Sequence, residues 1–415
     1  MAKRIIPISS GKGGVGKTTI AINYALCLSR HGRTVLIDLD TGTSSVRNSI
    51  DTPVSRDLYH FFRKGAPLAD CITALSPQLD PRGEFSRFGF VAGPRNLIED
   101  ISTFARPRRE RLIDAINALD ADFVVLDLKA GLDPAVLDFL PYSNSGILVF
   151  TPHMPAATLA ASDIVKAMLF RKLRAIFAPG AAIYTEMRGY SPAAVAAALD
   201  RVEDVYEASI HNLDAFTSQL ALNLGDHPAV RRVTSAVDSF VVHYVLNLFN
   251  GVQESYETAV RPLVENLADN VSSHLTVLNL GWVVAHDDIQ KASMRRVPAL
   301  LLPEEHPAAS PPDAVAAELR RLAEEYLGAR PVSPRPPVER REAPRTPSVS
   351  RYLEGQLDML LRMSEGMKGT SFRDNFSYIA YRSLHLMSSR SSADFGDTRL
   401  FKESEIQAML AERGR

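Results

Sequence analysis

The sequence predicts an α/β protein with a mainly parallel, doubly wound sheet. In the first half of the chain, short apolar runs alternate with helical patterns, which is the signature of βαβ units. A glycine-rich run, GKGGVGKTT, stands between the first apolar run and the first helical pattern, where phosphate-binding loops occur, and this placement predicts a sheet of the P-loop NTPase type. Around this sheet we also expect a helical insertion, a disordered linker and a short helical C-terminal tail.

Each predicted strand is a short apolar run, and each predicted helix has apolar positions three and four residues apart. The predicted strands are Ile5–Ile8, Thr34–Leu39, Phe88–Ala92, Phe123–Leu128, Gly146–Thr151, Val241–Asn247 and Leu275–Val284. Helical patterns at Thr18–Arg30 and Pro107–Leu119 lie between them. This alternation favours parallel pairing over hairpins.

Residues from about 152 to 240 form the predicted insertion, because nearly all of this stretch has helical patterns. The predicted helices are Ala156–Phe177, Pro192–Leu224 and Pro228–Ser239. One long crossover of the sheet therefore carries a helical subregion. A further pattern at Pro312–Leu327 predicts the helix that closes the domain.

The change in composition after residue 328 predicts three parts. We expect a nucleotide-binding domain over residues 1–328, a linker rich in proline and arginine over 329–350, and a helical tail over 351–415. The linker cannot bury a core and is expected to be extended and disordered. The first tail helix has one apolar stripe, made of Leu353, Leu357, Leu360, Leu361 and Met367.

Composition and charge set broad limits on function. The 415 residues are 46% apolar, and 47 basic side chains nearly balance 48 acidic ones, so no global field draws the chain to nucleic acid or anionic lipid. Cys27 and Cys71 have no metal-ligand spacing and predict a reducing compartment. There is no signal-peptide pattern and no apolar run of roughly 18 residues, so we expect a cytoplasmic protein.

The run GKGGVGKTT satisfies the P-loop pattern G-x-x-x-x-G-K-[ST] through Gly11, Gly16, Lys17 and Thr18. Glycines let backbone N–H groups converge on phosphate oxygens, and the following helix adds positive potential. Lys17 can reach the β- and γ-phosphates of ATP, and the Thr18 hydroxyl can ligate Mg²⁺. The residues expected to bind the nucleotide are Gly11, Gly13, Gly14, Val15, Gly16, Lys17, Thr18 and Thr19.

Acidic residues end two of the predicted strands. Asp38 and Asp40 end VLIDLD, and Asp127 ends the run DFVVLD. Carboxylates at the C-terminal ends of parallel strands point into the crevice where open α/β sheets bind ligands. Asp127 is therefore a candidate Walker B carboxylate for Mg²⁺, while a helix cap is the structural alternative for Asp38 or Asp40.

The early lysine in KGGVGKTT resembles the deviant Walker A motif of MinD/ParA-type ATPases. The resemblance implies that Lys12 crosses a dimer interface to the partner's phosphates, that Asp38 supports Mg²⁺, and that Asp40 positions the attacking water. It also implies that Asn247 contacts adenine and that the segment around Pro298 packs beside the base. The structural alternatives are a solvated loop lysine for Lys12 and a turn-forming asparagine at position 247.

In the motif DFVVLDLKAGLD, Gly131 falls where the second switch of this family senses the γ-phosphate. Lys129 departs from the family pattern, which commonly has a small residue or proline there, and this departure puts the competence for hydrolysis in question. Between about residues 3 and 303 the sequence is most similar in appearance to the FlhG-like branch of flagellar-number regulators. That branch implies a role at the inner membrane and cell pole, in placing or counting a polar machine.

Three surface features have competing interpretations. The basic clusters Arg106, Arg108, Arg109, Arg111 and Arg171, Lys172, Arg174 fit either phosphate binding or a solvated helix face. The tail stripe fits membrane insertion, but its polar face is nearly neutral, which is unfavourable for anionic lipid. Docking on a partner protein, or back on the domain, is the preferred hypothesis.

The favoured function is a slow, partner-stimulated ATPase that uses ATP and Mg²⁺ to switch its own homodimerisation. An activating or cargo protein is the expected partner, and a membrane surface or, less favoured, non-specific DNA are further candidates. The alternatives are a metabolic P-loop enzyme that drives ligation or phosphoryl transfer, and a scaffold that binds nucleotide without hydrolysing it. Substrate-dependent ADP release would identify the first alternative, and dimerisation without ADP formation the second.

Overall fold

The computed structural model describes residues 3–40, 45–95, 106–141, 144–178, 184, 191–203, 211–303, 317–322, 349–368, 370–388, 395, 398–402, 405 and 406. Its centre is a single sheet with the strand order β3-β4-β2-β5-β1-β6-β7-β8. The strands are β1 Arg4–Ser9, β2 Thr34–Leu39, β3 Thr73–Ala74, β4 Phe88–Val91, β5 Phe123–Leu128, β6 Asn144–Phe150, β7 Val241–Phe249 and β8 Thr276–Val284.

All neighbouring strands pair in parallel except β3 and β4, which pair antiparallel. The predicted fold class and all seven predicted strands are confirmed. The sequence analysis missed β3, because a two-residue edge strand is too short to give a periodic pattern. The central strands β2 and β5 are buried along their whole length, as expected for a parallel sheet covered on both faces.

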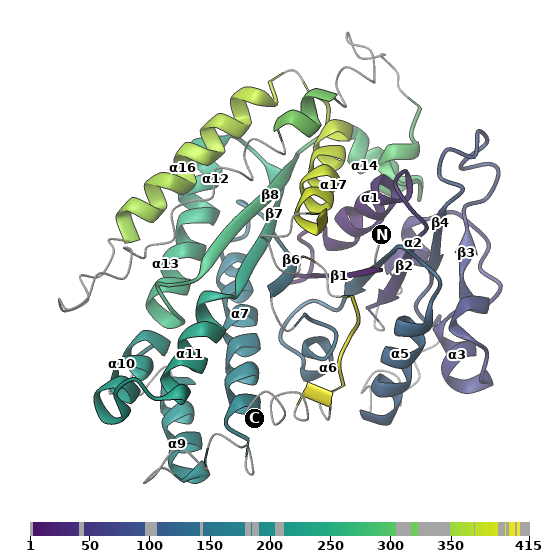
Figure 1. The fold of residues 1–415 in the computed structure, drawn as a ribbon. Helices are drawn as coiled ribbons and strands as arrows, with labels where there is room; N and C mark the ends of the chain where they lie inside the picture. Colours follow the sequence, from purple (N-terminus) through teal and green to yellow (C-terminus); the bar gives the residue numbers. More distant parts are fainter. Residues whose placement is uncertain are drawn as a thin grey trace.

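The helices cover both faces of this sheet and both of its ends (Figure 1). The α-helices are α1 Lys17–Ser29, α2 Ser45–Ser49, α3 Leu58–Lys64, α5 Arg106–Ala118, α6 Pro134–Leu137, α7 Pro155–Ile176, α9 Pro192–Glu203, α10 Leu213–Leu224, α11 Pro228–Asp238, α12 Val252–Ser255, α13 Arg261–Asn270, α14 Asp287–Met294, α16 Val349–Gly366 and α17 Phe372–Ser388. Shorter helical turns are η1 Leu68–Cys71, η2 Tyr256–Val260 and η3 Ala299–Leu301.

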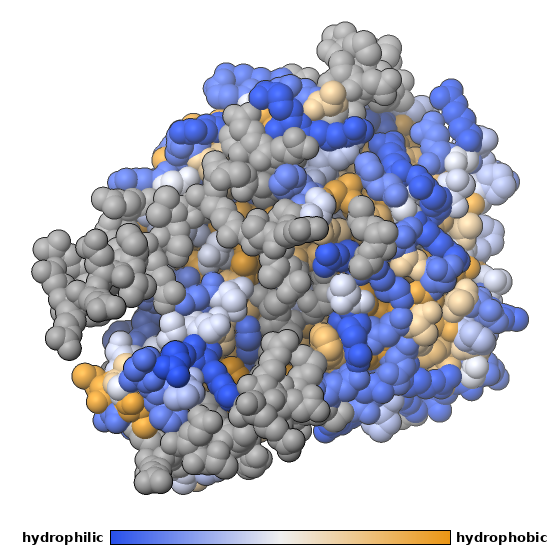
Figure 2. Space-filling view, in the orientation of Figure 1, coloured by the Kyte–Doolittle hydropathy of each residue, from blue (hydrophilic) through white to orange (hydrophobic). Residues whose placement is uncertain are grey.

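The insertion lies in the crossover from β6 to β7, as predicted. The helix predicted over Pro192–Leu224 is wrong in one respect, because Asn212 interrupts it with extended backbone and caps α10 by accepting a hydrogen bond from the Ala215 N–H. Apolar atoms gather at the lower left of Figure 2, over α10, where Leu222 is 87% exposed. Of the closing helix predicted over Pro312–Leu327, residues 317–322 are described and are helical.

The C-terminal tail packs back on the domain, which is one of the two forms of docking that the sequence analysis preferred over membrane insertion. α16 contacts α12 and α13, while α17 lies against α1 and β8 (Figure 1). In the predicted stripe Leu353, Leu360 and Met367 are buried, but Leu361 is 49% exposed. The predicted linker lies outside the described residues, apart from the start of α16 at Val349.

The tail covers both the edge and the face of the last strand. At the edge, the Tyr352 hydroxyl accepts a hydrogen bond from the Val277 N–H at 2.7 Å and lies 3.1 Å from the Val277 carbonyl. Gln356 Nε2 donates to the same carbonyl at 2.9 Å. On the face, Gly281 has φ 142°, and a Cβ there would lie 2.8 Å from Ile379 Cγ1, so a glycine is needed for α17 to approach β8.

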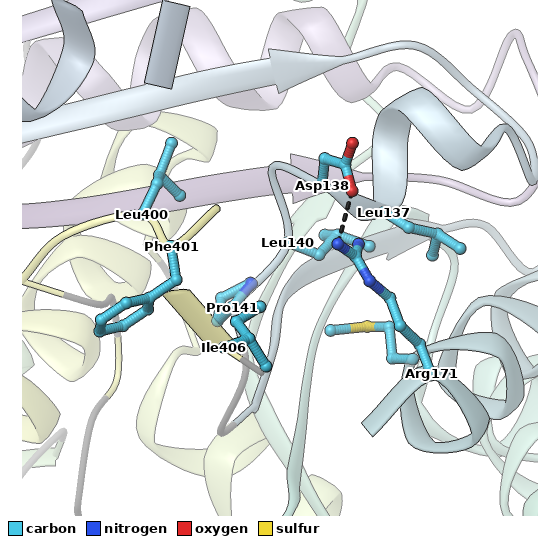
Figure 3. Close-up of a pocket in the computed structure, with 9 residues that line it drawn as sticks. Leu137, Asp138, Leu140, Pro141, Arg171, Leu400, Phe401 and Ile406 are labelled. Atoms are coloured by element: carbon cyan, nitrogen blue, oxygen red, sulfur yellow. Dashed lines mark hydrogen bonds and ion pairs between the residues drawn. The ribbon is translucent and has the colours of Figure 1, made fainter. Parts of the chain in front are cut away.

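The described residues near the C-terminus contact α5, through Leu400 and Lys402. The Asn117 side chain bonds both the N–H and the carbonyl of Leu400, each at 2.9 Å. Figure 3 shows Leu400 and Phe401 on one side of a pocket and Leu137 on the other, near α6, with Pro141 and Ile406 next to each other between them. None of the helices in the described part of the chain is long and apolar enough to cross a membrane.

Candidate functional site

The loop between β1 and α1 has the backbone shape that the glycine pattern predicts. Gly14 and Gly16 have φ values of 84° and 82°, which side chains other than glycine adopt at a cost. A Cβ on Gly11 would lie 2.4 Å from the Ala160 carbonyl carbon, so glycine also lets the loop pack against α7. Within the loop Gly11, Val15 and Lys17 are buried, Gly16, Thr18 and Thr19 are half-buried, and Lys12, Gly13 and Gly14 are exposed.

Lys17 and Thr18 both bond one carboxylate. β5 lies next to β1 with Asp127 in register with Ile8, so the Asp127 side chain projects toward the start of α1. Lys17 Nζ donates to Asp127 Oδ1 at 2.5 Å, and Thr18 Oγ1 donates to Asp127 Oδ2 at 2.7 Å. Lys17 is 6% exposed and Asp127 is fully buried, so each charge depends on the other for compensation.

A second carboxylate stands beside this pair. Asp38 on β2 is in register with Asp127 on β5, and it is fully buried. Its oxygens accept hydrogen bonds from the backbone N–H groups of Asp40 and Val46, each at 3.1 Å. Burial, together with the neighbouring Asp127 charge, raises the pKa of Asp38 to about 7. Each of these carboxylates makes ionisation of the other less favourable. A cation bound beside them would offset this repulsion.

Asp40 lies half-buried directly after β2, on the same edge of the sheet. Opposite it, the Gly131 N–H donates to the Ser10 carbonyl at 2.8 Å, with Gly131 at φ 92°. The predicted second switch therefore contacts the start of the P-loop. The Lys129 ammonium is half-exposed and lies 3.5 Å from the Asp133 carboxylate, so it is held on the outer side of this turn.

Asn247 contacts the P-loop itself. The side chain is 7% exposed, and its Nδ2 donates to the Val15 carbonyl at 2.9 Å. A Cβ on Gly16 would lie 2.1 Å from that nitrogen, so the asparagine fits against the loop because residue 16 is glycine. Pro298 is buried immediately before η3, which packs against α1.

The sequence analysis missed two residues that shape this site. Asn23, buried within α1, accepts a hydrogen bond from the Leu300 N–H at 3.0 Å and so ties the segment after Pro298 to the P-loop helix. Val46 contributes its backbone N–H to Asp38. A polar residue inside an otherwise apolar helix could have indicated Asn23, whereas a backbone donor leaves no signal in the sequence.

The two basic clusters are engaged largely within the chain. Arg109 and Arg171 bond the two oxygens of the Asp138 carboxylate. The bond from Arg171, which is 2.5 Å long, is drawn in Figure 3. The Arg111 guanidinium lies over the Phe61 ring, 4.6 Å from its centre. These contacts support the structural interpretation of both helix faces over phosphate binding.

The lysine, the hydroxyl, the two carboxylates and the left-handed glycines define a P-loop phosphate-binding domain whose donor set fits a polyphosphate with a divalent cation. A family model described as an AAA domain matches residues 3–168. Among curated proteins, the chain is 28% identical over 174 residues to the septum site-determining protein MinD of Escherichia coli strain K12, covering 41% of this chain and 60% of that protein.

A chloroplastic MinD homologue of Arabidopsis thaliana is 30% identical over 159 residues, covering 37% of this chain and 47% of the homologue. The match spans about half the length of these curated relatives. Among solved structures, MinD of Pyrococcus horikoshii in complex with Mg-ADP has a TM-score of 0.41 at 15% identity, covering 72% of this chain and 88% of its own. MinD of Pyrococcus furiosus has a TM-score of 0.40 at 17% identity, covering 74% and 93%.

Proposed function

We propose that this protein is a MinD/ParA-type ATPase in which ATP and Mg²⁺ control homodimerisation. The observation that carries the proposal is the convergence of Lys17, Thr18, Asp38 and Asp127 at the C-terminal edge of a parallel sheet, beneath a loop with left-handed glycines. Sequence similarity to MinD proteins over the same part of the chain supports it.

In this proposal, the chain's own ion pair is exchanged for the nucleotide. Lys17 would leave Asp127 for the β- and γ-phosphates, and the Thr18 hydroxyl, Asp38 and Asp127 would hold Mg²⁺. The cation supplies charge compensation for the phosphates. The backbone N–H groups from Gly11 to Thr19 bind phosphate oxygens, Asp40 orients the attacking water, and Asn247 and Pro298 lie on the base side.

The surface around the loop supports a dimer contact there. Lys12 is exposed at the tip of the loop. Two large apolar side chains beside the loop are also exposed: Leu132, which follows Gly131, is 51% exposed, and Leu159, which precedes Ala160, is 46% exposed. Exposed apolar side chains next to a cation that reaches outward suit burial against a second copy carrying its own nucleotide.

The finer proposal is an FlhG-like role, in which slow, partner-stimulated hydrolysis controls the position or number of a cellular machine such as a polar flagellum. The activating or cargo protein would bind the nucleotide-bound dimer. The proposed site of action is the cytoplasm, with recruitment to the inner membrane or the cell pole. Division of the chain into a domain over 1–328, a linker over 329–350 and a tail over 351–415 belongs to the same proposal.

The test is the molar mass by size-exclusion chromatography with light scattering, in Mg-ADP and in Mg-ATP. We expect the wild type to double its mass in ATP, Asp40→Ala to hold the dimer longer because hydrolysis is blocked, and Lys12→Ala to stay monomeric while still binding ATP. Lys17→Ala should lose nucleotide binding altogether.

Lys368→Ala is the matched control, because Lys368 is an exposed lysine on the tail that pairs only with Glu365 in the described structure. It should behave as the wild type does. If the molar mass of the wild type is the same in ADP and in ATP, the proposed dimerisation switch is wrong. If the protein binds ATP but forms no ADP, the alternative of a non-hydrolysing scaffold is supported.

A further inference from the structure

A buried arginine lies where the tail covers the sheet. Arg382 is on α17, which packs against α1 and β8 (Figure 1), and its side chain is fully buried. Arginine keeps its positive charge in proteins, and a buried charge is costly unless an opposite charge compensates it. This residue lies outside the P-loop motifs, and the proposed ATPase assigns it no role.

The contacts of Arg382 leave its charge uncompensated. Nη1 donates to the Tyr378 hydroxyl at 3.0 Å and lies 3.7 Å from Met363 Sδ, and both partners are neutral. Its Nε and Nη2 have no hydrogen-bond partner, although both atoms are buried. Within the described ranges of the chain, no carboxylate forms an ion pair with this guanidinium.

The sheet below presents further polar atoms without partners. Tyr244 on β7 and Asn279 on β8 are in register, and both side chains are fully buried. The Tyr244 hydroxyl and the Asn279 amide are close enough to interact with each other, but neither forms a hydrogen bond of good geometry. The Arg382 charge acts on the same hydroxyl. We refer to Arg382, Tyr244 and Asn279 as the buried cluster, because α17 packs against β8 over this part of the sheet.

None of the titratable neighbours supplies a negative charge. Burial, with the Arg382 charge adding to it, lowers the pKa of His243 to about 3, so this imidazole is neutral at physiological pH. Burial likewise raises the pKa of Tyr244, which keeps its hydroxyl protonated. The described cluster therefore carries one net positive charge at neutral pH.

The chemistry of the cluster selects the class of ligand. Its unpartnered groups are mainly donors, namely the Arg382 Nε and Nη2 groups, the Tyr244 hydroxyl and the Asn279 amide nitrogen. A buried water would satisfy hydrogen bonds but would leave the charge. A small anion satisfies both, and complete burial excludes a large one.

We propose that Arg382, Tyr244 and Asn279 form an internal binding site for a small inorganic anion such as chloride, enclosed when α17 docks on the sheet. The anion compensates the charge of the guanidinium and accepts hydrogen bonds from the N–H and O–H groups that lack partners. It thereby stabilises the docked tail.

Bromide locates such a site directly, because it replaces chloride and scatters anomalously. Crystals of the full chain grown in bromide should show an anomalous peak within hydrogen-bond distance of Arg382 Nε or Nη2. A water at that position without anomalous signal, or bromide peaks confined to the surface, would overturn the proposal. This measurement uses only the wild type, and its outcome is independent of whether ATP binds.

A second measurement compares thermal unfolding in sodium chloride and in sodium gluconate at equal ionic strength. Chloride should raise the melting temperature of the wild type by about 2 °C or more, because a ligand that binds only the folded state stabilises it. Arg382→Met should remove the difference between the two salts, and Arg382→Lys should retain part of it. Arg362→Met, at an exposed arginine paired with Asp358 on α16, should retain all of it.

Equal melting temperatures of the wild type in both salts would contradict the anion site. So would an Arg382→Met protein that still responds to chloride as the wild type does. If Arg382→Met does not fold, the comparison of wild type with Arg382→Lys and the bromide crystals still decide the question.

Discussion

Two buried cationic side chains in the described part of the chain, Lys17 and Arg382, have opposite surroundings. Lys17, at the nucleotide edge of the sheet, is paired with Asp127 at 2.5 Å within the chain. Arg382, on the sheet face beneath the tail, has no carboxylate partner in the described structure and keeps two unpartnered nitrogens. A ligand at the first site must displace an internal ion pair, whereas a ligand at the second completes one.

From this difference we expect a ligand that exchanges at the Lys17 site and a ligand that stays bound at the Arg382 site. In the proposed ATPase, displacing the Lys17–Asp127 pair costs part of the binding energy, which favours release of the nucleotide once its γ-phosphate is lost. At Arg382 none of the described carboxylates competes with a ligand, so the proposed anion would stay bound as part of the fold. The contrast predicts that changes near Lys17 alter ligand exchange, while changes beneath the tail alter stability.

The largest effect is expected when pH changes the ionisation of Asp38, which lies beside the Lys17–Asp127 pair. The pKa of Asp38, raised by burial and Asp127, is about 7 in the folded chain and near 3.8 when exposed. The folded state therefore binds the extra proton between about pH 4 and pH 7, and the free energy of unfolding falls as pH rises through that window. Mg²⁺ needs the ionised carboxylate, so its affinity should rise by about tenfold per pH unit below pH 7.

Isothermal titration of Mg-ADP between pH 5.5 and 8 measures this dependence. The phosphates titrate in the same range, so the informative quantity is the difference between the wild type and Asp38→Asn, which lacks the titrating group. Parallel pH profiles for the two proteins would show that Asp38 is already ionised and that repulsion by Asp127 is weak.

A smaller effect on ligand affinity is expected from substituting Asn247. The pattern of the effect decides whether this residue supports the P-loop or contacts adenine. The amide donates to the Val15 carbonyl within the P-loop, so Asn247→Ala should weaken ATP, GTP and tripolyphosphate alike, by roughly fivefold for one hydrogen bond of about 1 kcal/mol. A residue that contacts adenine would instead weaken ATP alone. Asn250→Ala is the control at the same strand end, since that side chain bonds Ser255 and not the loop.

The first of the two regions was predictable from the sequence and the second was not. GKGGVGKTT and the strand-ending Asp38 and Asp127 lie at positions where local pattern and parallel topology fix the geometry, so their convergence follows. Arg382 bonds Tyr378 and its charge acts on Tyr244, which lies 138 positions earlier in the chain, and only the docking of α17 brings these residues near one another. The tail stripe predicted that α16 is buried on one side, but a stripe does not name the surface that covers it.

The smallest effect is expected at the edge that the tail protects. Tyr352→Phe removes the acceptor of the Val277 N–H, and Gln356 continues to bond the Val277 carbonyl, so one donor alone loses its partner. Urea unfolding should show a loss of about 1 kcal/mol. Tyr59→Phe is the control, because no hydrogen bond of its hydroxyl occurs in the described structure, and it should change the free energy of unfolding little.

An unchanged stability in Tyr352→Phe would mean that water reaches the Val277 N–H and that α16 covers the edge only loosely. A loss several times larger would mean that the whole tail undocks when one bond is removed. In that second case the anion response of the wild type should disappear together with the tail, because Arg382 reaches Tyr244 and Asn279 only while α17 is in place. Measuring the chloride dependence of Tyr352→Phe therefore tests whether the edge and the face beneath the tail form one cooperative unit.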